Sequence, residues 1–181
     1  LDAAAATQEG VRYIVDATPG AARYLPHLTG RKVYVLHLVR DMRSWTRSQI
    51  RRNGSNPIST YAKWRRANQR MVEAFADFGD RYFRIGYEEF ALEPRASLEM
   101  ICNWLGLDFD DRMIRPSENT KSHAISGNSL LRRKGAASEI RYDGAWLAEP
   151  SNGFVNALAY AVLGKKNRAW VYGNGLIGAR R

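Results

Sequence analysis

The stretch KVYVLHLVRDMRSWTRS, residues 32–48, decides the fold of this chain. Its first part, the apolar run 33–39, is rich in β-branched and aromatic side chains, which predicts a buried and parallel strand. Asp41 follows as a candidate N-cap for a helix through Trp45 and Ile50. The sequence here therefore predicts a strand that passes directly into a helix.

An arginine and a serine flank this junction at a spacing that suits an anion. Arg40 ends the expected strand, and Ser48 lies two turns into the expected helix. In an open α/β sheet, ligands bind at the carboxyl edge of the strands. A guanidinium and a hydroxyl that converge there provide charged and neutral donors for a phosphate. The alternative is a strand-end arginine that is solvated or pairs with a nearby carboxylate.

Further strands and helices alternate along the rest of the chain. We expect strands at 11–16 and 81–85, and helices at about 59–78, from Pro94 to Gly106, near 143–147 and at 152–163. Trp64 belongs to an apolar stripe of the long helix and is expected in the core. This alternation predicts an α/β fold, a parallel sheet flanked by helices in three layers. With three expected strands, the sheet is small and incomplete for a free-standing domain.

Composition restricts the classes of partner. The chain has 181 residues with 28 basic and 18 acidic side chains, a net charge of +10, which favours an anionic partner. No C2H2 finger, RNA-recognition signature or Cys/His metal cluster is present, so neither a specific nucleic acid nor a metal is expected. No apolar run approaches a membrane span. The single cysteine, Cys102, falls in an apolar helical pattern and fits a reducing compartment, and we expect a cytoplasmic protein.

Several short motifs occur in an order that resembles the sulfotransferase family. They are Val15-Asp16-Ala17-Thr18-Pro19, Arg40-Asp41 through Ser48, Gly86-Tyr87-Glu88-Glu89-Phe90 with Glu93-Pro94-Arg95, and Ser122 to Asn128 running into Arg132-Arg133-Lys134-Gly135. The resemblance covers roughly residues 11–150. It implies a nucleotide-kinase-like, P-loop-type architecture and the transfer of a sulfuryl group from 3′-phosphoadenosine 5′-phosphosulfate to an acceptor hydroxyl or amine. The acceptor would be a small molecule or a carbohydrate.

The resemblance also implies which residues bind the donor. Arg40 and Ser48 match the positions that hold its 3′-phosphate, and Thr18 is a further candidate contact. The C-terminal cofactor segment, which closes over the nucleotide, corresponds to Gly127, Asn128, Arg132, Arg133, Lys134 and Gly135. A glycine-containing loop followed by cations can approach and neutralise a phosphate.

The chain departs from the family in the residues of the chemical step. No glycine-rich loop for the 5′-phosphosulfate matches, so we expect a single domain, 1–181, that is truncated at its N-terminus or is not a competent transferase alone. Ala17 stands where relatives often carry a lysine, serine or histidine. Asp16 and His123 remain the catalytic candidates, although Asp16 and Thr18 also fit a strand-end cap and turn.

Two further readings follow from these departures. The chain could be a non-catalytic nucleotide- or polyanion-binding protein that kept a degenerate sulfotransferase fold. A kinase-like phosphoryl transferase ranks last, because no Gly-x-x-x-x-Gly-Lys-[Ser/Thr] loop is present. Residues 165–181 are expected to form a flexible or peripheral tail. A lumenal location stays open if an N-terminal anchor has been removed, and the sequence predicts no oligomeric state.

Overall fold

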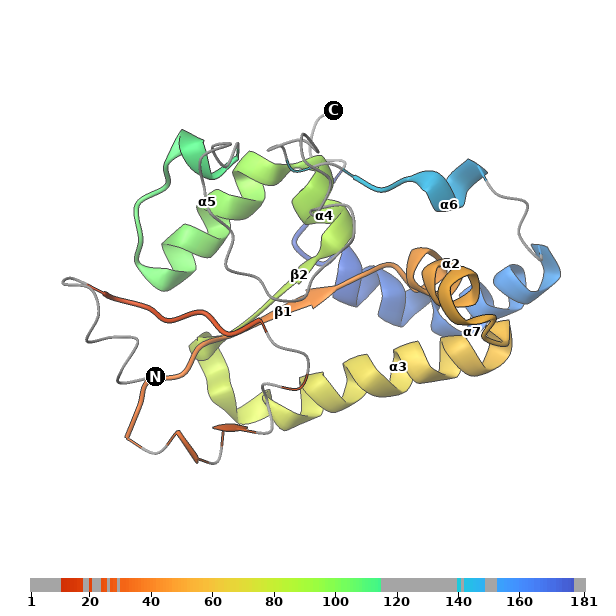
Figure 1. Cartoon of the computed structure of the whole chain (residues 1–181), viewed down its shortest axis with the longest axis horizontal. Coiled ribbons are helices and arrows are strands. Elements are labelled where there is room, and N and C mark those ends of the chain that lie inside the picture. The colour runs from red at the N-terminus through yellow and green to blue at the C-terminus, as the bar shows by residue number, and fades with distance from the viewer. Residues whose placement is uncertain are drawn as a thin grey trace. The chain divides into compact units, whose positions relative to one another are not determined.

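The computed structural model describes residues 11–17, 20, 24–25, 27–28, 30–114, 140, 142–148 and 153–177 (Figure 1). The chain divides into two compact units, Leu1–Tyr34 and Val35–Arg181. In the first unit, residues 11–17 have no regular secondary structure, so the strand expected at 11–16 is not formed. The side chain of Val15 is 86% exposed. This segment therefore lacks the buried apolar face that stabilises a strand.

A parallel pair of strands forms the sheet of the second unit. Strand β1, Val35–Val39, pairs in parallel with β2, Tyr82–Gly86, and Val39 lies opposite Gly86 at the carboxyl end. Both strands and their parallel pairing were predicted. Within the described residues the sheet has two strands, fewer than the three expected.

Helices cover the two faces of this sheet unequally. On one face, His37 of β1 bonds Asn68 of α3, Pro57–Ala74. On the other face, Phe83 of β2 stacks on Trp104 of α5, Pro94–Leu105. Leu36 and Leu38 of β1 are 46% and 52% exposed, so the apolar run is not buried on both faces as expected. The described part of the chain therefore leaves these two leucines of β1 uncovered.

The helices begin and end at the residues that the sequence marks. Asp41 caps α2, Met42–Asn53, by accepting the Arg43 N–H at 2.8 Å, and Gly54 ends it with φ +61°. Pro94 begins α5, and Gly106 ends it with φ +65°. Positive φ values of this size favour glycine at a helix C-terminus. The long helix α3 ends at Ala74, earlier than predicted, and the 3₁₀ segment η2, Ala76–Arg81, leads into β2.

The remaining elements are shorter, except the last helix. They are α4, Tyr87–Leu92, the 3₁₀ turn η3, Asp111–Met113, α6, Ala145–Ala148, and α7, Gly153–Val171. Residues 165–171, expected to belong to a flexible or peripheral tail, form the last turns of α7. Trp170 and Val171 are buried there. Within the described residues, no helix is both long and apolar enough for a membrane span.

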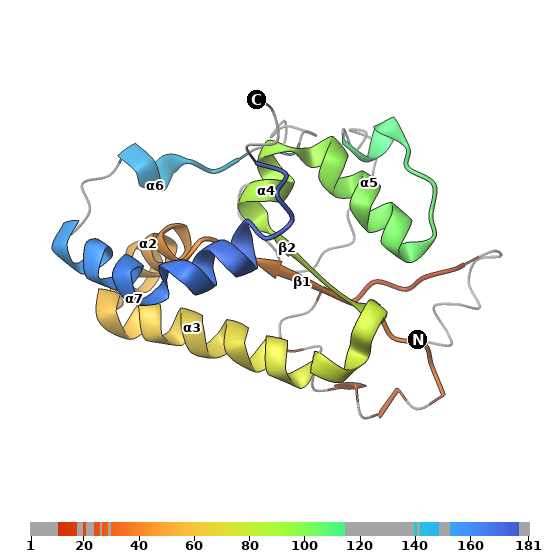
Figure 2. The same cartoon turned by 180° about the vertical axis from the view of Figure 1, so that it is seen from behind.

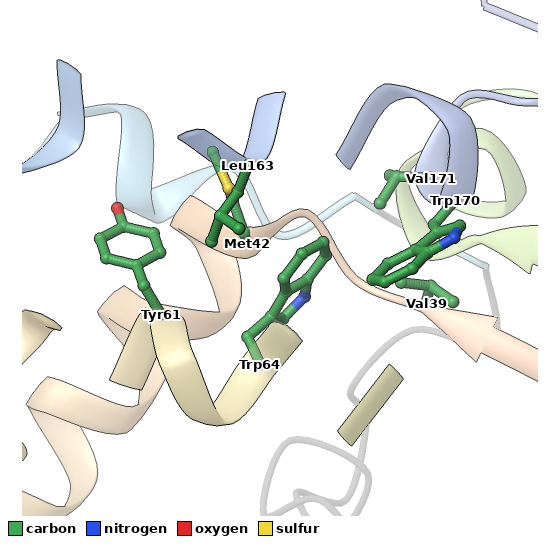
Figure 3. Packing of buried hydrophobic residues seen from close by; sticks show 7 residues of the cluster. All are labelled: Val39, Met42, Tyr61, Trp64, Leu163, Trp170 and Val171. Atoms are coloured by element: carbon green, nitrogen blue, oxygen red, sulfur yellow. The ribbon is translucent and has the colours of Figure 1, made fainter. Parts of the chain in front are cut away.

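The core of the second unit lies where β1 ends, between α2, α3 and α7 (Figure 3). It contains Val39, Met42, Tyr61, Trp64, Leu163, Trp170 and Val171. The rings of Trp64 and Trp170 lie 5.5 Å apart, which confirms Trp64 as a core residue. The Trp64 indole N–H also donates to the Arg40 carbonyl at 2.8 Å. The core therefore supports the backbone at the carboxyl end of β1.

Gly86, at the carboxyl end of β2, lies in direct contact with the backbone at the end of α7. A Cβ at this position would overlap the Val171 carbonyl group. Because the obstacle is backbone rather than a flexible side chain, the helix would have to shift. A glycine is therefore required at this position for α7 to reach the sheet.

We predict that Gly86→Ala destabilises the protein by about 1–3 kcal/mol, the typical cost of overpacking. Urea unfolding followed by circular dichroism measures the change. The matched control is Gly153→Ala at the start of α7, where an added Cβ meets nothing within 4 Å. Equal stability of Gly86→Ala and the parent would contradict the close packing of α7 on β2.

Candidate functional site

Arg40 stands at the carboxyl end of β1 and, among the described residues, contacts the side chains of Ser44, Asp143 and Tyr87. Its Nε donates to the Ser44 hydroxyl at 2.6 Å, and its Nη2 pairs with the Asp143 carboxylate at 3.3 Å. The guanidinium lies 5.1 Å from the centre of the Tyr87 ring. About a quarter of the side chain is exposed, at 26%. The site thus holds an oriented, accessible cation that already binds one anionic group.

Ser48 does not bond Arg40 in this arrangement. The hydroxyl that Arg40 bonds belongs to Ser44, one turn earlier in α2. Residues four apart lie on the same helix face, so the half-buried Ser48 lies on the Ser44 side of α2. The hydroxyl beside Arg40 therefore belongs to the buried Ser44, which lies between the two predicted residues in the sequence. The sequence predicted the more distant hydroxyl, that of Ser48, one turn further along α2.

Tyr87 and Asp143 complete the surroundings of Arg40. Tyr87 begins α4 directly after β2, and its hydroxyl accepts the backbone N–H of Asp143 at 3.0 Å. The register that places Val39 opposite Gly86 also brings the two strand ends together. Tyr87 could have been found from the sequence, because it follows the strand next to Arg40 at the same sheet edge. No sequence signal pointed to Asp143, which joins the site from more than a hundred residues away.

Beside Arg40, the carboxylate of Asp41 is completely buried and fully bonded. It accepts from the Arg43 guanidinium, from Asn167 Nδ2 at 2.8 Å and from the Tyr172 hydroxyl at 2.9 Å. Burial alone would raise the pKa of Asp41, but the hydrogen bonds from Arg43 and Asn167 outweigh it and hold the pKa below its usual value. The carboxylate therefore stays charged and links α2 to the end of α7.

Two adjacent glutamates of α4 anchor this region from the other side. Glu88 is 2% exposed, and its Oε2 accepts the Asp41 backbone N–H at 2.9 Å. Its Oε1 has no hydrogen-bond partner within the described part of the chain. Burial raises the pKa of Glu88 to about 7, and this effect outweighs the hydrogen bond from the Asp41 backbone N–H, which lowers the pKa. Glu89 is fully buried and accepts from Asn174 Nδ2 at 2.8 Å.

Most of the other predicted site residues lie outside the described residues. They are Thr18, His123, Gly127, Asn128, Arg132, Arg133, Lys134 and Gly135. Asp16 is described and exposed, but it belongs to the N-terminal unit. His37 is a buried histidine of β1, with its Nδ1 2.7 Å from the Tyr82 hydroxyl. Among the described residues, no cluster of side chains has the composition of a metal site.

Comparison with known proteins gives one family and one fold. Residues 1–111, more than half of the chain, match the model of the sulfotransferase family. The structure resembles the sulfotransferase domain from the Synechococcus PCC 7002 olefin synthase, with a TM-score of 0.52 and 22% sequence identity. The alignment covers 73% of this chain and 50% of that domain, so the chain spans about half of its relative. At this identity the likeness concerns the fold alone. The search of curated proteins finds no match.

The raised pKa of Glu88 predicts a pH-dependent stability. Folding favours the protonated form, so its contribution is complete below the usual value of 4.5 and is lost as the pH rises through about 7. Glu88→Gln keeps an acceptor for the Asp41 N–H and cannot ionise. We expect the stability of the parent relative to Glu88→Gln to fall by about 2–3 kcal/mol between pH 5 and pH 8.

Urea unfolding at each pH measures this difference. Burial lowers the pKa of His37, which makes stability rise with pH, but His37 is present in both proteins and its effect cancels. A constant difference between the two proteins from pH 5 to pH 8 would show that Glu88 is not a buried, protonatable group.

Proposed function

Because the chain belongs to the sulfotransferase family, we propose that it transfers a sulfuryl group from 3′-phosphoadenosine 5′-phosphosulfate to an acceptor hydroxyl or amine. The observation that carries this proposal is Arg40 at the carboxyl end of β1, oriented by the Ser44 hydroxyl and paired with a carboxylate. The acceptor is proposed to be a small molecule or a carbohydrate. The chain spans about half of its structural relative. We therefore also propose, as a separate point, that this chain alone can carry out the transfer.

The residues around Arg40 fit the 3′-phosphate of this donor. The carboxylate of Asp143 lies 3.3 Å from the Arg40 guanidinium, in the kind of contact that a phosphate oxygen would make. A phosphate carries more charge than a carboxylate and accepts from several donors at once. Arg40 and the Ser48 hydroxyl would hold the 3′-phosphate, and Ser44 would fix the orientation of Arg40. The Tyr87 ring offers an aromatic surface beside it.

The buried carboxylate of Asp41 has a positioning role in this proposal. It fixes the first turn of α2 and so sets the direction of Arg40 and of the serines on that helix. Its own charge is compensated by Arg43, Asn167 and Tyr172 and does not repel the donor directly. The donor supplies the activated sulfuryl group. Asp16, Thr18 and His123 remain the proposed contacts for the reacting groups, with the segment Gly127–Asn128 and Arg132–Gly135 closing over the nucleotide.

One observation favours a second function, binding without transfer. Ala17 occupies the position where related enzymes often carry a side chain for the sulfuryl group or the base. A methyl group can neither donate to the transferring group nor accept a proton. A protein of this kind would bind 3′-phosphoadenosine 5′-phosphate and leave the donor intact. Both functions use the same nucleotide site, so they differ only in the chemical step.

We predict that Arg40→Ala weakens binding of 3′-phosphoadenosine 5′-phosphate by about 2–3 kcal/mol, because a charge-assisted contact is lost. Isothermal titration calorimetry measures the affinity, and a thermal melt verifies that the variant is folded. The matched control is Arg52→Ala, an exposed arginine in the last turn of the same helix, which should bind like the parent. Unchanged affinity in Arg40→Ala would overturn the site assignment.

Incubation of the parent protein with the donor and a panel of alcohols and amines separates the two functions. Sulfated product that disappears in Arg40→Ala supports the transferase. Tight nucleotide binding without any sulfated product supports the binding protein.

A further inference from the structure

An apolar groove lies on a second surface, separate from the residues around Arg40, and the proposed function does not use it. The groove runs between α3 and α7, and its cavity has a volume of about 740 Å³. Figure 2 shows these two helices running side by side in the same direction. Tyr61, Ala159 and Leu163 contribute to its lining from the edge of the core. The Arg40 contacts come instead from α2, α4 and residue 143.

Interhelical hydrogen bonds fix the width of this groove. The Tyr61 hydroxyl donates to Asn156 Oδ1 at 2.6 Å, and Lys166 Nζ donates to Gln69 Oε1 at 2.5 Å. These bonds lie near opposite ends of the contact between α3 and α7. The groove is therefore formed before any partner arrives, which lowers the entropic cost of binding.

The walls of the groove expose large apolar side chains to solvent. Ile58, Leu158 and Val162 are 66%, 55% and 68% exposed, and Phe154 is 83% exposed. A contiguous exposed apolar patch of this kind marks an interaction surface. Side chains this exposed do not enclose a small ligand, since pockets for small molecules bury most of the ligand surface. The geometry favours a protein segment that lies along the groove.

The charge of the groove restricts the identity of that segment. Arg65, Arg66 and Arg70 line the α3 side, and in the described part of the chain they make no ion pair. Glu73 is the acidic residue of the lining. A second copy of this chain, with a net charge of +10, would bring like charges together. A bilayer surface is flat and does not fill a concave groove.

We propose that this groove docks an acidic amphipathic helix of a partner protein. From Ile58 to Glu73 the α3 wall extends for about 22 Å, which matches a helix of about 15 residues. Apolar side chains of the partner at i, i+3, i+4 and i+7 would enter between Leu158, Val162 and Ile58. Its glutamates or aspartates would pair with the arginines of α3, where a planar guanidinium suits a carboxylate. This inference does not depend on the proposed transferase activity.

A designed peptide tests the chemistry of the groove on the full chain. The probe is a fluorescent helical peptide of about 15 residues, with leucines at that spacing and glutamates on the flanks. The control peptide keeps the same leucines and has a lysine at each position of a glutamate. Fluorescence anisotropy at low salt should show binding of the acidic peptide at least about tenfold tighter than the basic one. Equal binding of the two peptides would overturn the proposal.

Variants locate the binding site on the protein. Val162→Asp and Arg66→Glu should each weaken binding of the acidic peptide by about tenfold or more, through lost apolar contact and through repulsion. Both side chains are exposed, so neither change disturbs the core. The matched controls are Leu147→Asp, an exposed leucine of α6, and Arg52→Glu in α2. If the controls weaken binding as much as the groove variants, the proposed location is wrong.

Two further measurements test the other possible occupants of the groove, a second copy of the chain and a membrane surface. Sedimentation equilibrium of the parent and of Val162→Asp tests a second copy: a dimer lost in the variant would overturn the proposal. Co-sedimentation with vesicles of phosphatidylserine and phosphatidylcholine tests a membrane surface. Vesicle binding that needs Val162, without selective binding of the acidic peptide, would overturn it as well.

Discussion

The structure of the second unit depends on one buried charge, the carboxylate of Asp41. An ionised carboxylate without water is tolerated only where hydrogen bonds and opposite charge compensate it. Arg43 provides the charge, and Asn167 and Tyr172 fill the remaining acceptor positions. Asn167 lies near the end of α7, and Tyr172 directly follows the helix. Their hydrogen bonds to this carboxylate therefore hold the C-terminal helix against the β1–α2 junction.

Groups close to the Asp41 carboxylate also hold Arg40 in position. The Arg40 carbonyl accepts from the Trp64 indole N–H, so its backbone is held from α3. Its guanidinium donates to Ser44 and pairs with the carboxylate of Asp143. On the other side, Glu88 holds the backbone N–H of Asp41. The candidate site is thus assembled from the ends of both strands, from three helices and from the 142–148 segment. The same packing of α7 against α3 forms the arginine-lined groove on a different face.

Local signals in the sequence predicted the helix boundaries, which depend on residues close together in the chain. The Asp41 cap, the Gly54 and Gly106 helix ends and the Pro94 helix start each rest on interactions within one turn. The contacts of Asp143 with Arg40 and of Asn167 with Asp41 join distant segments and have no pattern in composition or spacing. The apolar run of β1 predicted a strand, but exposure of Leu36 and Leu38 depends on how many helices cover the sheet. The residues 165–171 looked peripheral because their anchor is a carboxylate far away in the sequence.

We infer that the Asp41 carboxylate, rather than apolar packing alone, holds the end of α7 at the β1–α2 junction. Amide hydrogen exchange of Asp41→Asn tests it most directly, with Asp110→Asn as the control. Asp110 makes the same hydrogen bonds to an arginine two residues later, Arg112, but on the surface. We predict faster exchange for residues 167–172 and for the first turn of α2 in Asp41→Asn, with α5 unchanged and no effect in Asp110→Asn. Protection of residues 167–172 equal to that of the parent protein would contradict the account.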